Sequence, residues 1–171
     1  CVGWLPGGMG HVNVASSVVF GGISGSSVAD IASLGAIEIN AMTRHGYDKG
    51  YAVGMTLATS TLSSIIPPSI LMVIAGSIAN QSIGLLLIAG LVPGLFIAGF
   101  LMVYNHFYSV RRGICKPTPF DFRHFGKAAV RAILPMLTPV ILMVGILDGF
   151  FTPTEAAAIA VVYTFFIAAI V

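Results

Sequence analysis

No Asp, Glu, Lys or Arg occurs between residues 50 and 110 of this chain. A helix needs about 20 mostly apolar residues to span a bilayer, so this segment is long enough for two or three crossings. The composition of the whole sequence also indicates a membrane protein, because 57% of its residues are hydrophobic and only 8% are charged. An ordinary soluble domain has about 25% charged residues. The composition predicts an all-α, polytopic transmembrane protein in a lipid bilayer. It excludes soluble globular domains, disordered tails and modules that bind nucleic acid.

The positive charges predict how the chain is oriented in the membrane. Six of the eight Lys and Arg residues lie within residues 111–131, and the other two are Arg44 and Lys49. Cytoplasmic loops are enriched in Lys and Arg, so both groups are expected on the cytoplasmic side, separated by an even number of crossings. Residues 111–131 are therefore expected to form a cytoplasmic basic arm, either an amphipathic helix at the interface or a solvated loop.

The uncharged segment divides into two expected crossings. Residues 51–79 form the first and residues 83–103 the second, with the polar residues 80–82 between them. The first crossing is expected to be a broken helix, because Pro67 and Pro68 lack N–H groups and their rings clash with the preceding turn.

The C-terminal part is expected to add a third crossing over residues 132–151. Thr152 and Glu155 follow with the spacing of a helix cap, in which Thr152 is the N-cap and Glu155 lies three residues later. The apolar run over residues 156–171 is expected to begin a transmembrane helix that is truncated. The chain is accordingly interpreted as a piece of a longer protein.

Residues 11–43 predict a re-entrant helical hairpin. They contain two apolar arms, of thirteen and fifteen residues, on either side of a polar tip at residues 24–27. At 1.5 Å per residue each arm is about 20 Å long, whereas the hydrocarbon core is about 30 Å thick. The chain is therefore expected to enter and leave on the same side. A tip at membrane depth survives only where protein covers it or where it lines a wet cavity, which makes it a candidate binding site.

The tip has the chemistry to bind ions. Ser27 together with Asp30 is expected to cap the second arm, whose partially positive N-terminus favours an anionic substrate group. An acidic group at membrane depth is also a candidate ion ligand, although capping accounts for Asp30. Carbonyls that end the first arm, with the hydroxyls of Ser24 and Ser26, suit a small hard cation such as Na⁺. The alternative is that Gly25 and the serines only allow close helix packing.

A second candidate site precedes the double proline, where six hydroxyl-bearing residues gather. A helix break frees carbonyl groups, and these together with hydroxyls such as that of Ser60 describe an alkali-ion site. The alternative is that the hydroxyls bond to the backbone of their own helix. The candidates in this segment are Thr56, Thr59, Ser60, Thr61, Ser63, Ser64 and Pro67.

Five motifs follow one another along the chain: HVNVASSVVFGGISGSSVAD at residues 11–30, HGYDKGYAVG at 45–54, IIPPSI at 65–70, IAGLVPGL at 88–95 and GFFTPTEAAAIAVVY at 149–163. Together they resemble the large membrane subunit of TRAP (tripartite ATP-independent periplasmic) transporters, the DctM-like permeases. The resemblance implies half of an inverted-repeat, elevator-type transporter in the bacterial inner membrane, driven by a Na⁺ gradient and needing no other cofactor. It also implies three partners: a small TRAP membrane subunit, a periplasmic substrate-binding protein and an organic-acid substrate.

The resemblance also implies where the site lies. It assigns Na⁺ ligands and the lining of the substrate cavity to Ser24, Gly25 and Ser26 and to residues 60–69. The second inverted half, with its own hairpin, does not lie in this sequence. A positive helix end suits C4-dicarboxylates, sialic acid, keto acids and sugar acids alike.

Three alternative functions remain open at this point. A stand-alone Na⁺/carboxylate symporter of related architecture would use the same site without a binding protein. An intramembrane serine protease would use Ser24, because Gly22, Ser24 and Gly25 match the G-x-S-G pattern that resembles rhomboid proteases. Such an enzyme needs a His within hydrogen-bond reach, and the histidines at or after the tip lie near expected cytoplasmic ends. A structural bundle or channel is the third, although no carbonyl filter motif or charged ring is present.

Overall fold

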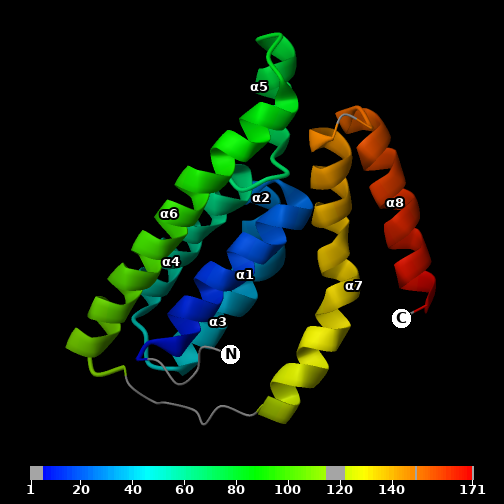
Figure 1. Cartoon of the computed structure of the whole chain (residues 1–171). Helices are drawn as coiled ribbons and strands as arrows, with labels where there is room; N and C mark the ends of the chain where they lie inside the picture. The colour runs from blue at the N-terminus through cyan, green and yellow to red at the C-terminus, as the bar shows by residue number, and fades with distance from the viewer. Residues whose placement is uncertain (1–5, 115–121, 149, 171) are drawn as a thin grey trace.

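In the computed structural model, residues 6–114, 122–148 and 150–170 are described (Figure 1). Every regular element in these ranges is helical, which confirms the all-α prediction. In chain order the elements are α1 (Gly8–Ser24), α2 (Ser27–Asp30), the π-helical segment η1 (Ile31–Gly35), α3 (Ala36–Arg44), α4 (Lys49–Ser60), the 3₁₀ segment η2 (Thr61–Ser64), α5 (Ile70–Ile78), α6 (Ile83–Arg111), α7 (Phe122–Leu147) and α8 (Pro153–Ile170).

The first helices form a two-armed hairpin whose arms begin and end at the same end of the molecule (Figure 1). α1 starts at Gly8, earlier than the expected residue 11, and it stops because Gly25 takes a left-handed conformation with φ of 61°. The turn consists of Gly25 and Ser26 and is shorter than the expected four-residue tip. The second arm runs through α2, η1 and α3 to Arg44. With 17 residues, α1 is about 25 Å long.

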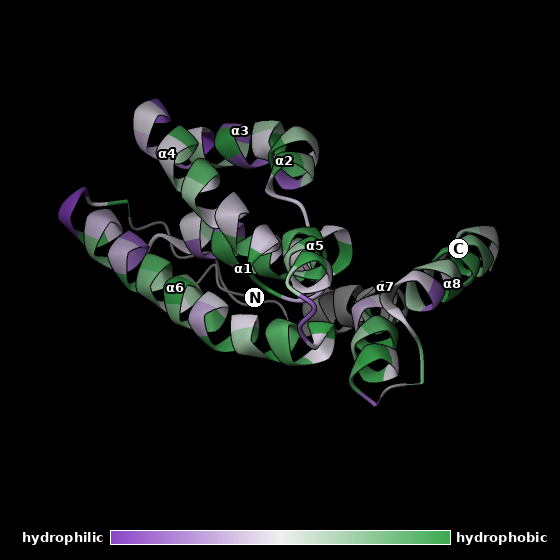
Figure 2. Cartoon of the chain, turned by 90° about the horizontal axis from the view of Figure 1, so that it is seen from above, coloured by the Kyte–Doolittle hydropathy of each residue, from purple (hydrophilic) through white to green (hydrophobic). Residues whose placement is uncertain are grey.

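α1 is the central helix of this part of the protein. It packs against α3, α4 and α6, and the view from above shows it between the α3–α4 pair and α6 (Figure 2). Val14 of α1, Met42 of α3 and Leu62 of η2 have no exposed surface. The core therefore joins both arms of the hairpin to the segment that precedes the prolines.

The chain between α4 and α5 loses its regular helix around the two prolines. α4 ends at Ser60, and η2 continues as a tighter 3₁₀ turn to Ser64. α5 begins only after Ser69, whose Oγ accepts a hydrogen bond from the N–H of Met72 at 3.3 Å. Prolines lack the N–H that a helix interior needs, so residues 51–79 contain two short helices joined by an irregular segment.

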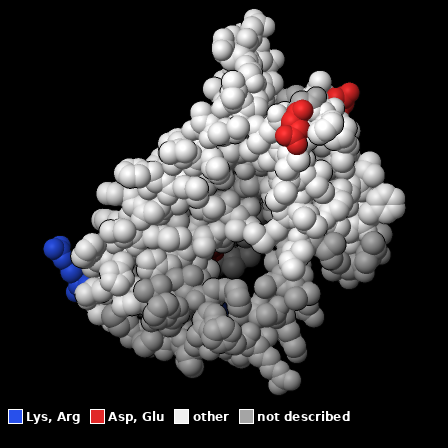
Figure 3. Space-filling view, viewed as in Figure 1, with Lys and Arg blue, Asp and Glu red and all other residues white. Residues whose placement is uncertain are grey.

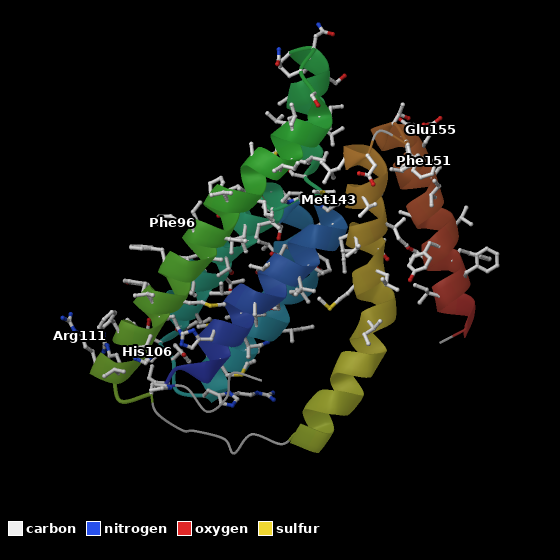
Figure 4. The ribbon with its side chains drawn as sticks, in the orientation of Figure 1. Phe96, His106, Arg111, Met143, Phe151 and Glu155 are labelled. Carbon is white, nitrogen blue, oxygen red and sulfur yellow. The ribbon has the colours of Figure 1, made fainter. Side chains whose placement is uncertain are left out.

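α6 contains 29 residues and is about 44 Å long. In the part of the chain that the structure describes, it is the one helix that is long and apolar enough to cross a membrane. Two shorter apolar helical stretches cover Met136–Leu147 and Thr154–Ala168. Phe96 projects outward from the middle of α6 (Figure 4) and is 77% exposed.

α6 continues to Arg111, beyond the expected end at residue 103, because other elements hold its last turns. Asn105 Nδ2 donates a hydrogen bond to the carbonyl of Gly7 at 3.0 Å. The hydroxyl groups of Tyr47 and Ser109 are 3.1 Å apart. These buried contacts tie the C-terminal end of α6 to the start of α1 and to the loop before α4.

Two glycines let α6 lie directly against the irregular segment. A Cβ atom at Gly90 would lie 2.7 Å from the carbonyl oxygen of Ile65, and one at Gly94 would lie 2.6 Å from Cγ1 of Ile66. Real Cβ atoms do not approach other atoms this closely, so a larger residue at either position would displace α6. Small residues serve the same purpose in other membrane helix interfaces.

α7 differs from its expected bounds. It begins at Phe122, inside the expected basic arm of residues 111–131, and runs without interruption to Leu147. The change from basic to apolar composition near residue 132 does not end the helix, because a helix stop needs a cap or a breaker. Residues 115–121 of the expected arm lie outside the described residues.

Charged groups gather at opposite ends of the face seen in Figure 3, with Lys and Arg at the end of α6 and Asp and Glu at the α7–α8 turn. Figure 4 labels Arg111 and Glu155 at these two ends. Between them α6 is mostly hydrophobic (Figure 2). The separation is compatible with the predicted orientation, in which Arg111 is cytoplasmic.

α8 begins with the reciprocal cap that the sequence predicts. Thr152 Oγ1 accepts a hydrogen bond from the N–H of Glu155 at 3.3 Å. In return, Glu155 Oε2 accepts hydrogen bonds from the Thr152 N–H at 2.8 Å and from its hydroxyl at 2.9 Å. The helix starts at Pro153, directly after the N-cap.

Replacing Thr152 with Ala is expected to lower the free energy of unfolding by about 1 kcal/mol, because the start of α8 loses its side-chain cap. Thermal unfolding of the full-length protein in detergent would show this as a lower Tm. Thr154→Ala is the matched control, since Thr154 lies inside the first turn of the helix and does not cap it. Equal Tm losses in the two variants would count against the cap.

Candidate ion- and substrate-binding site

The hairpin turn meets the irregular segment between α4 and α5 directly. The N–H of Ile70 donates to the carbonyl of Gly25 at 3.3 Å, and the N–H of Ser27 donates to Ser64 Oγ at 3.2 Å. A Cβ atom at Gly25 would lie 2.5 Å from the carbonyl oxygen of Pro68. The two segments that the sequence singled out as candidate sites therefore lie in direct contact.

Asp30 does not cap the second arm as predicted. The N-cap of α2 is Ser26 and not Ser27, because Ser26 has the extended backbone that a cap needs and its Oγ accepts from the N–H of Ala29 at 3.4 Å. Asp30 lies one turn further on, is only 2% exposed, and turns its carboxylate toward η2. There Asp30 Oδ2 accepts a hydrogen bond from Ser63 Oγ at 2.8 Å.

The Asp30 carboxylate is incompletely satisfied. Its Oδ1 atom is buried and has no hydrogen-bond partner. Among the described residues no Lys or Arg forms an ion pair with it. An unpaired charge is costly to bury, and proteins neutralise it with a proton, a cation or a metal ion.

Ser17 and Ser63 place further oxygen atoms beside this carboxylate. Ser63 Oγ is within hydrogen-bond distance of the Ser17 carbonyl at 3.2 Å as well as of Asp30. Ser17 Oγ is buried and, like Asp30 Oδ1, has no partner. We call Ser17, Asp30 and Ser63 the Asp30 cluster. Carboxylate, hydroxyl and carbonyl oxygens are the ligands that hard cations take.

The structure brings together most, but not all, of the predicted site residues. The contact between the hairpin turn and the helix break contains Gly25, Ser26, Ser64 and Pro67. Ser63 is hydrogen-bonded to Asp30. Ser24 ends α1 at the same turn, where its Oγ accepts from the N–H of Ser26 at 3.4 Å.

Ser60 and Thr61 are directed elsewhere. Their hydroxyls donate to the carbonyls of Leu57 at 2.8 Å and Ala58 at 2.7 Å in their own helix, and Thr61 is exposed. For these two residues the structure has the alternative that the sequence left open, in which the hydroxyl bonds to its own backbone. The predicted role of Ser60 as a Na⁺ ligand has no geometric support in this arrangement.

A second buried polar group lies next to the Asp30 cluster, and it joins the predicted residues Thr56 and Thr59 to Asn13 and Glu38, which sequence reasoning did not identify as site residues. Asn13 Nδ2 donates to Glu38 Oε2 at 3.0 Å and to Thr56 Oγ1 at 2.8 Å. Thr59 Oγ1 donates to Asn13 Oδ1 at 2.6 Å. Ser16 Oγ also donates to Glu38. An acidic residue in an otherwise apolar arm was the available signal, but its partners are far away in sequence.

A cavity of about 360 Å³ opens beside the hairpin turn. Ile23 and Ser24 line it on one side, Pro68 and Ser69 on another, and apolar residues of α5, α7 and α8 complete it. Its lining is mostly apolar with a few hydroxyl groups, which is the usual character of a small-molecule site.

The geometry does not support the serine-protease alternative. The nearest partners of Ser24 Oγ are the backbone groups of Ser26. His11 lies thirteen residues earlier on the same helix, so it is about 20 Å away along the axis. Within the described part of the chain, no histidine forms a hydrogen bond to Ser24.

Comparison with known proteins gives one consistent result. The family model described as "Tripartite ATP-independent periplasmic transporter, DctM component" matches residues 1–171. The chain is 41% identical over 170 residues to the sialic acid TRAP transporter large permease protein SiaM of Vibrio cholerae. It is 40% identical over 168 residues to the C4-dicarboxylate TRAP transporter large permease protein DctM of the same organism. It is 36% identical over 162 residues to the ectoine TRAP transporter large permease protein TeaC of Halomonas elongata.

These alignments cover 99%, 98% and 95% of this chain but only 40%, 37% and 38% of the three relatives. The chain thus spans about two fifths of the length of the curated relatives it matches.

Proposed function

Because the chain belongs to the family of the DctM component of tripartite ATP-independent periplasmic transporters, we propose that it is part of the large permease subunit of a Na⁺-coupled importer of organic acids. The family is one of membrane-embedded transport proteins. Beyond family membership, we propose Na⁺ as the coupling ion, an organic acid as the substrate and two further proteins as partners.

The observation that carries Na⁺ coupling is the Asp30 cluster. A buried carboxylate with one unpartnered oxygen, next to a buried hydroxyl that also lacks a partner, is an acceptor-rich site without a cation of its own. A monovalent cation bound there would neutralise the charge and would be coordinated by the two oxygen atoms that lack a partner. The site lies where two helical segments meet, so bound Na⁺ would stabilise the contact between the hairpin and the broken helix.

The substrate class follows from the cavity and from the relatives. Relatives carry the names of transporters for sialic acid, C4-dicarboxylates and ectoine, and all three of these solutes bear carboxylate groups. In this chain the cavity beside Ser24 supplies hydroxyl groups and an apolar wall. We assign the carboxylate-bearing solute to this cavity.

The proposed setting is the bacterial inner membrane, with a small membrane subunit and a periplasmic substrate-binding protein as partners. The hairpin is proposed to be re-entrant, entering and leaving on the cytoplasmic side, which accords with Arg44, Lys49 and Arg111 at helix ends. The hairpin and the broken helix would move together in an elevator-like step.

The test uses the full-length protein with its small subunit in proteoliposomes. Uptake of labelled sialic acid and labelled succinate is followed under an inward Na⁺ gradient, with and without the binding protein. Uptake that requires both Na⁺ and the binding protein supports the proposal. Uptake that ignores the binding protein indicates a stand-alone symporter, and uptake that ignores Na⁺ rejects the ion site.

A further inference from the structure

Asn13 and Thr59 lie one helical turn away from the Asp30 cluster, on the same two helical segments. Asn13 is four residues before Ser17 on α1, and Thr59 is four residues before Ser63 along α4 and η2. On α1, residues four apart lie on one face of the helix, and the contacts of Thr59 with Asn13 and of Ser63 with Ser17 show that both side chains face α1. The Asn13–Thr59 hydrogen bond at 2.6 Å and the contact of Ser63 Oγ with the Ser17 carbonyl at 3.2 Å are therefore neighbouring links between the same two segments.

We propose that Asn13 and Thr59 are positioning residues that set the Na⁺ affinity of the Asp30 cluster by holding Ser63 in register with Ser17 and Asp30. This inference rests on the proposed function, because it assumes that the Asp30 cluster binds Na⁺. Neither residue would touch the ion.

The Asn13 side chain is held in one orientation, because both its amide nitrogen and its amide oxygen have hydrogen-bond partners in the fold. The side chain is 1% exposed. Its amide nitrogen donates to Glu38 on α3 and to Thr56 on α4, and its oxygen accepts from Thr59. The acceptors Glu38 and Thr56 dictate which end of the amide is the nitrogen, so the oxygen must face Thr59. The amide therefore has one orientation, and it links three helices.

Ser63 is buried and its Oγ lies within hydrogen-bond distance of Asp30 and of the Ser17 carbonyl, but it lies near the end of the helical segment that carries it. At Thr61 the chain leaves the α-helix for a 3₁₀ turn, and four residues after Ser63 the first proline follows. The last helical hydrogen bonds of this segment join the N–H groups of Ile65 and Ile66 to the carbonyl of Leu62, at 3.0 and 2.7 Å. The side-chain link from Thr59 to Asn13 is the last one before the helix changes its geometry.

The matched variants are Thr59→Val, Thr59→Ser and Thr43→Val in the full-length permease. Valine has nearly the shape of threonine but lacks the hydroxyl that reaches Asn13, whereas serine retains it. Thr43 is the control, since its hydroxyl bonds only to carbonyls of its own helix, Ile39 at 2.9 Å and Asn40 at 3.0 Å. The measurement is the Tm of each purified protein as NaCl is titrated, with choline chloride holding the ionic strength constant.

We expect Thr59→Val to raise the Na⁺ concentration for half-maximal stabilisation about tenfold, the lower end of what losing an outer-shell partner costs a metal site. Thr59→Ser and Thr43→Val should stay within about twofold of the wild type. A purely structural role would lower the Tm without Na⁺ and leave the half-maximal concentration unchanged.

The outcomes separate this inference from the function on which it rests. If the wild type is stabilised by Na⁺ and Thr59→Val has the same half-maximal concentration, the positioning role is wrong and the ion site stands. Equal losses in Thr59→Val and Thr59→Ser would also overturn it, because serine keeps the hydroxyl. If the wild type shows no stabilisation by Na⁺ over choline, the ion site fails and the positioning role fails with it.

Discussion

Replacing Asp30 with Asn is expected to abolish Na⁺-dependent uptake and to weaken Na⁺ binding by a factor of about one hundred or more. Removing one partner of a buried ion pair costs about 3 kcal/mol at least, which corresponds to that factor. The variant should also show a second, opposite effect. Without Na⁺ the wild type buries an uncompensated carboxylate, so the Na⁺-free Tm of Asp30→Asn should be higher than that of the wild type.

Asp48→Asn is the matched control for this prediction. Asp48 is exposed and caps α4, accepting a hydrogen bond from the N–H of Tyr51 at 3.2 Å, and Asn caps helices about as well as Asp. Its Na⁺ dependence should equal that of the wild type. Wild-type Na⁺ affinity in Asp30→Asn, measured by the same NaCl titration, would remove Asp30 from the site.

Replacing Gly25 with Ala is expected to destabilise the permease by about 2–5 kcal/mol and to reduce uptake strongly. The left-handed backbone at Gly25 costs an L-residue about 1–2 kcal/mol. In addition, the new Cβ would lie 2.5 Å from the carbonyl oxygen of Pro68, and relieving such overpacking typically costs a further 1–3 kcal/mol. The hairpin turn would have to separate from the irregular segment, which opens the proposed site.

Gly113→Ala is the matched control that separates the steric cost of the new Cβ from the cost of the left-handed backbone. Gly113 has φ of 65°, close to the 61° of Gly25, but no atom of the described residues lies within 4 Å of the position that its Cβ would occupy. Both variants carry the same conformational cost, so the difference between their Tm values measures the close approach to Pro68. Similar Tm values would mean that the turn and the segment can part without cost.

Features that depend on local backbone chemistry could be predicted from the sequence. A turn near Gly25, a helix break near Pro67 and the cap at Thr152 each follow from residues adjacent in the chain. The position of a cap to within one residue could not be predicted. Ser26 and Ser27 have the same side chain, and only the turn geometry determines that Ser26 is the N-cap.

The partners of buried polar side chains were beyond the reach of sequence patterns. Asn13 and Glu38 are 25 residues apart, and Asp30 and Ser63 are 33 residues apart. Once Ser27 was assigned the cap, Asp30 had a sufficient local role, and its contact with Ser63 carried no separate signal. The sequence left two alternatives for the hydroxyls of Ser60 and Thr61, and in the structure both bond to carbonyls of their own helical segment.

The close contact of α6 with the irregular segment constrains how the sequence of α6 can drift over evolutionary time. On the inner side of the helix, Gly90 and Gly94 touch Ile65 and Ile66 so closely that the smallest addition, a methyl group, disturbs the fold. On the outer side, Phe96 is 77% exposed, and any residue that dissolves in lipid will serve there. Along α6, positions that face the irregular segment should therefore be substituted slowly and positions that face lipid should be substituted fast, with the 3.6-residue period of the helix. The slowly changing positions mark the contact with the segment between α4 and α5.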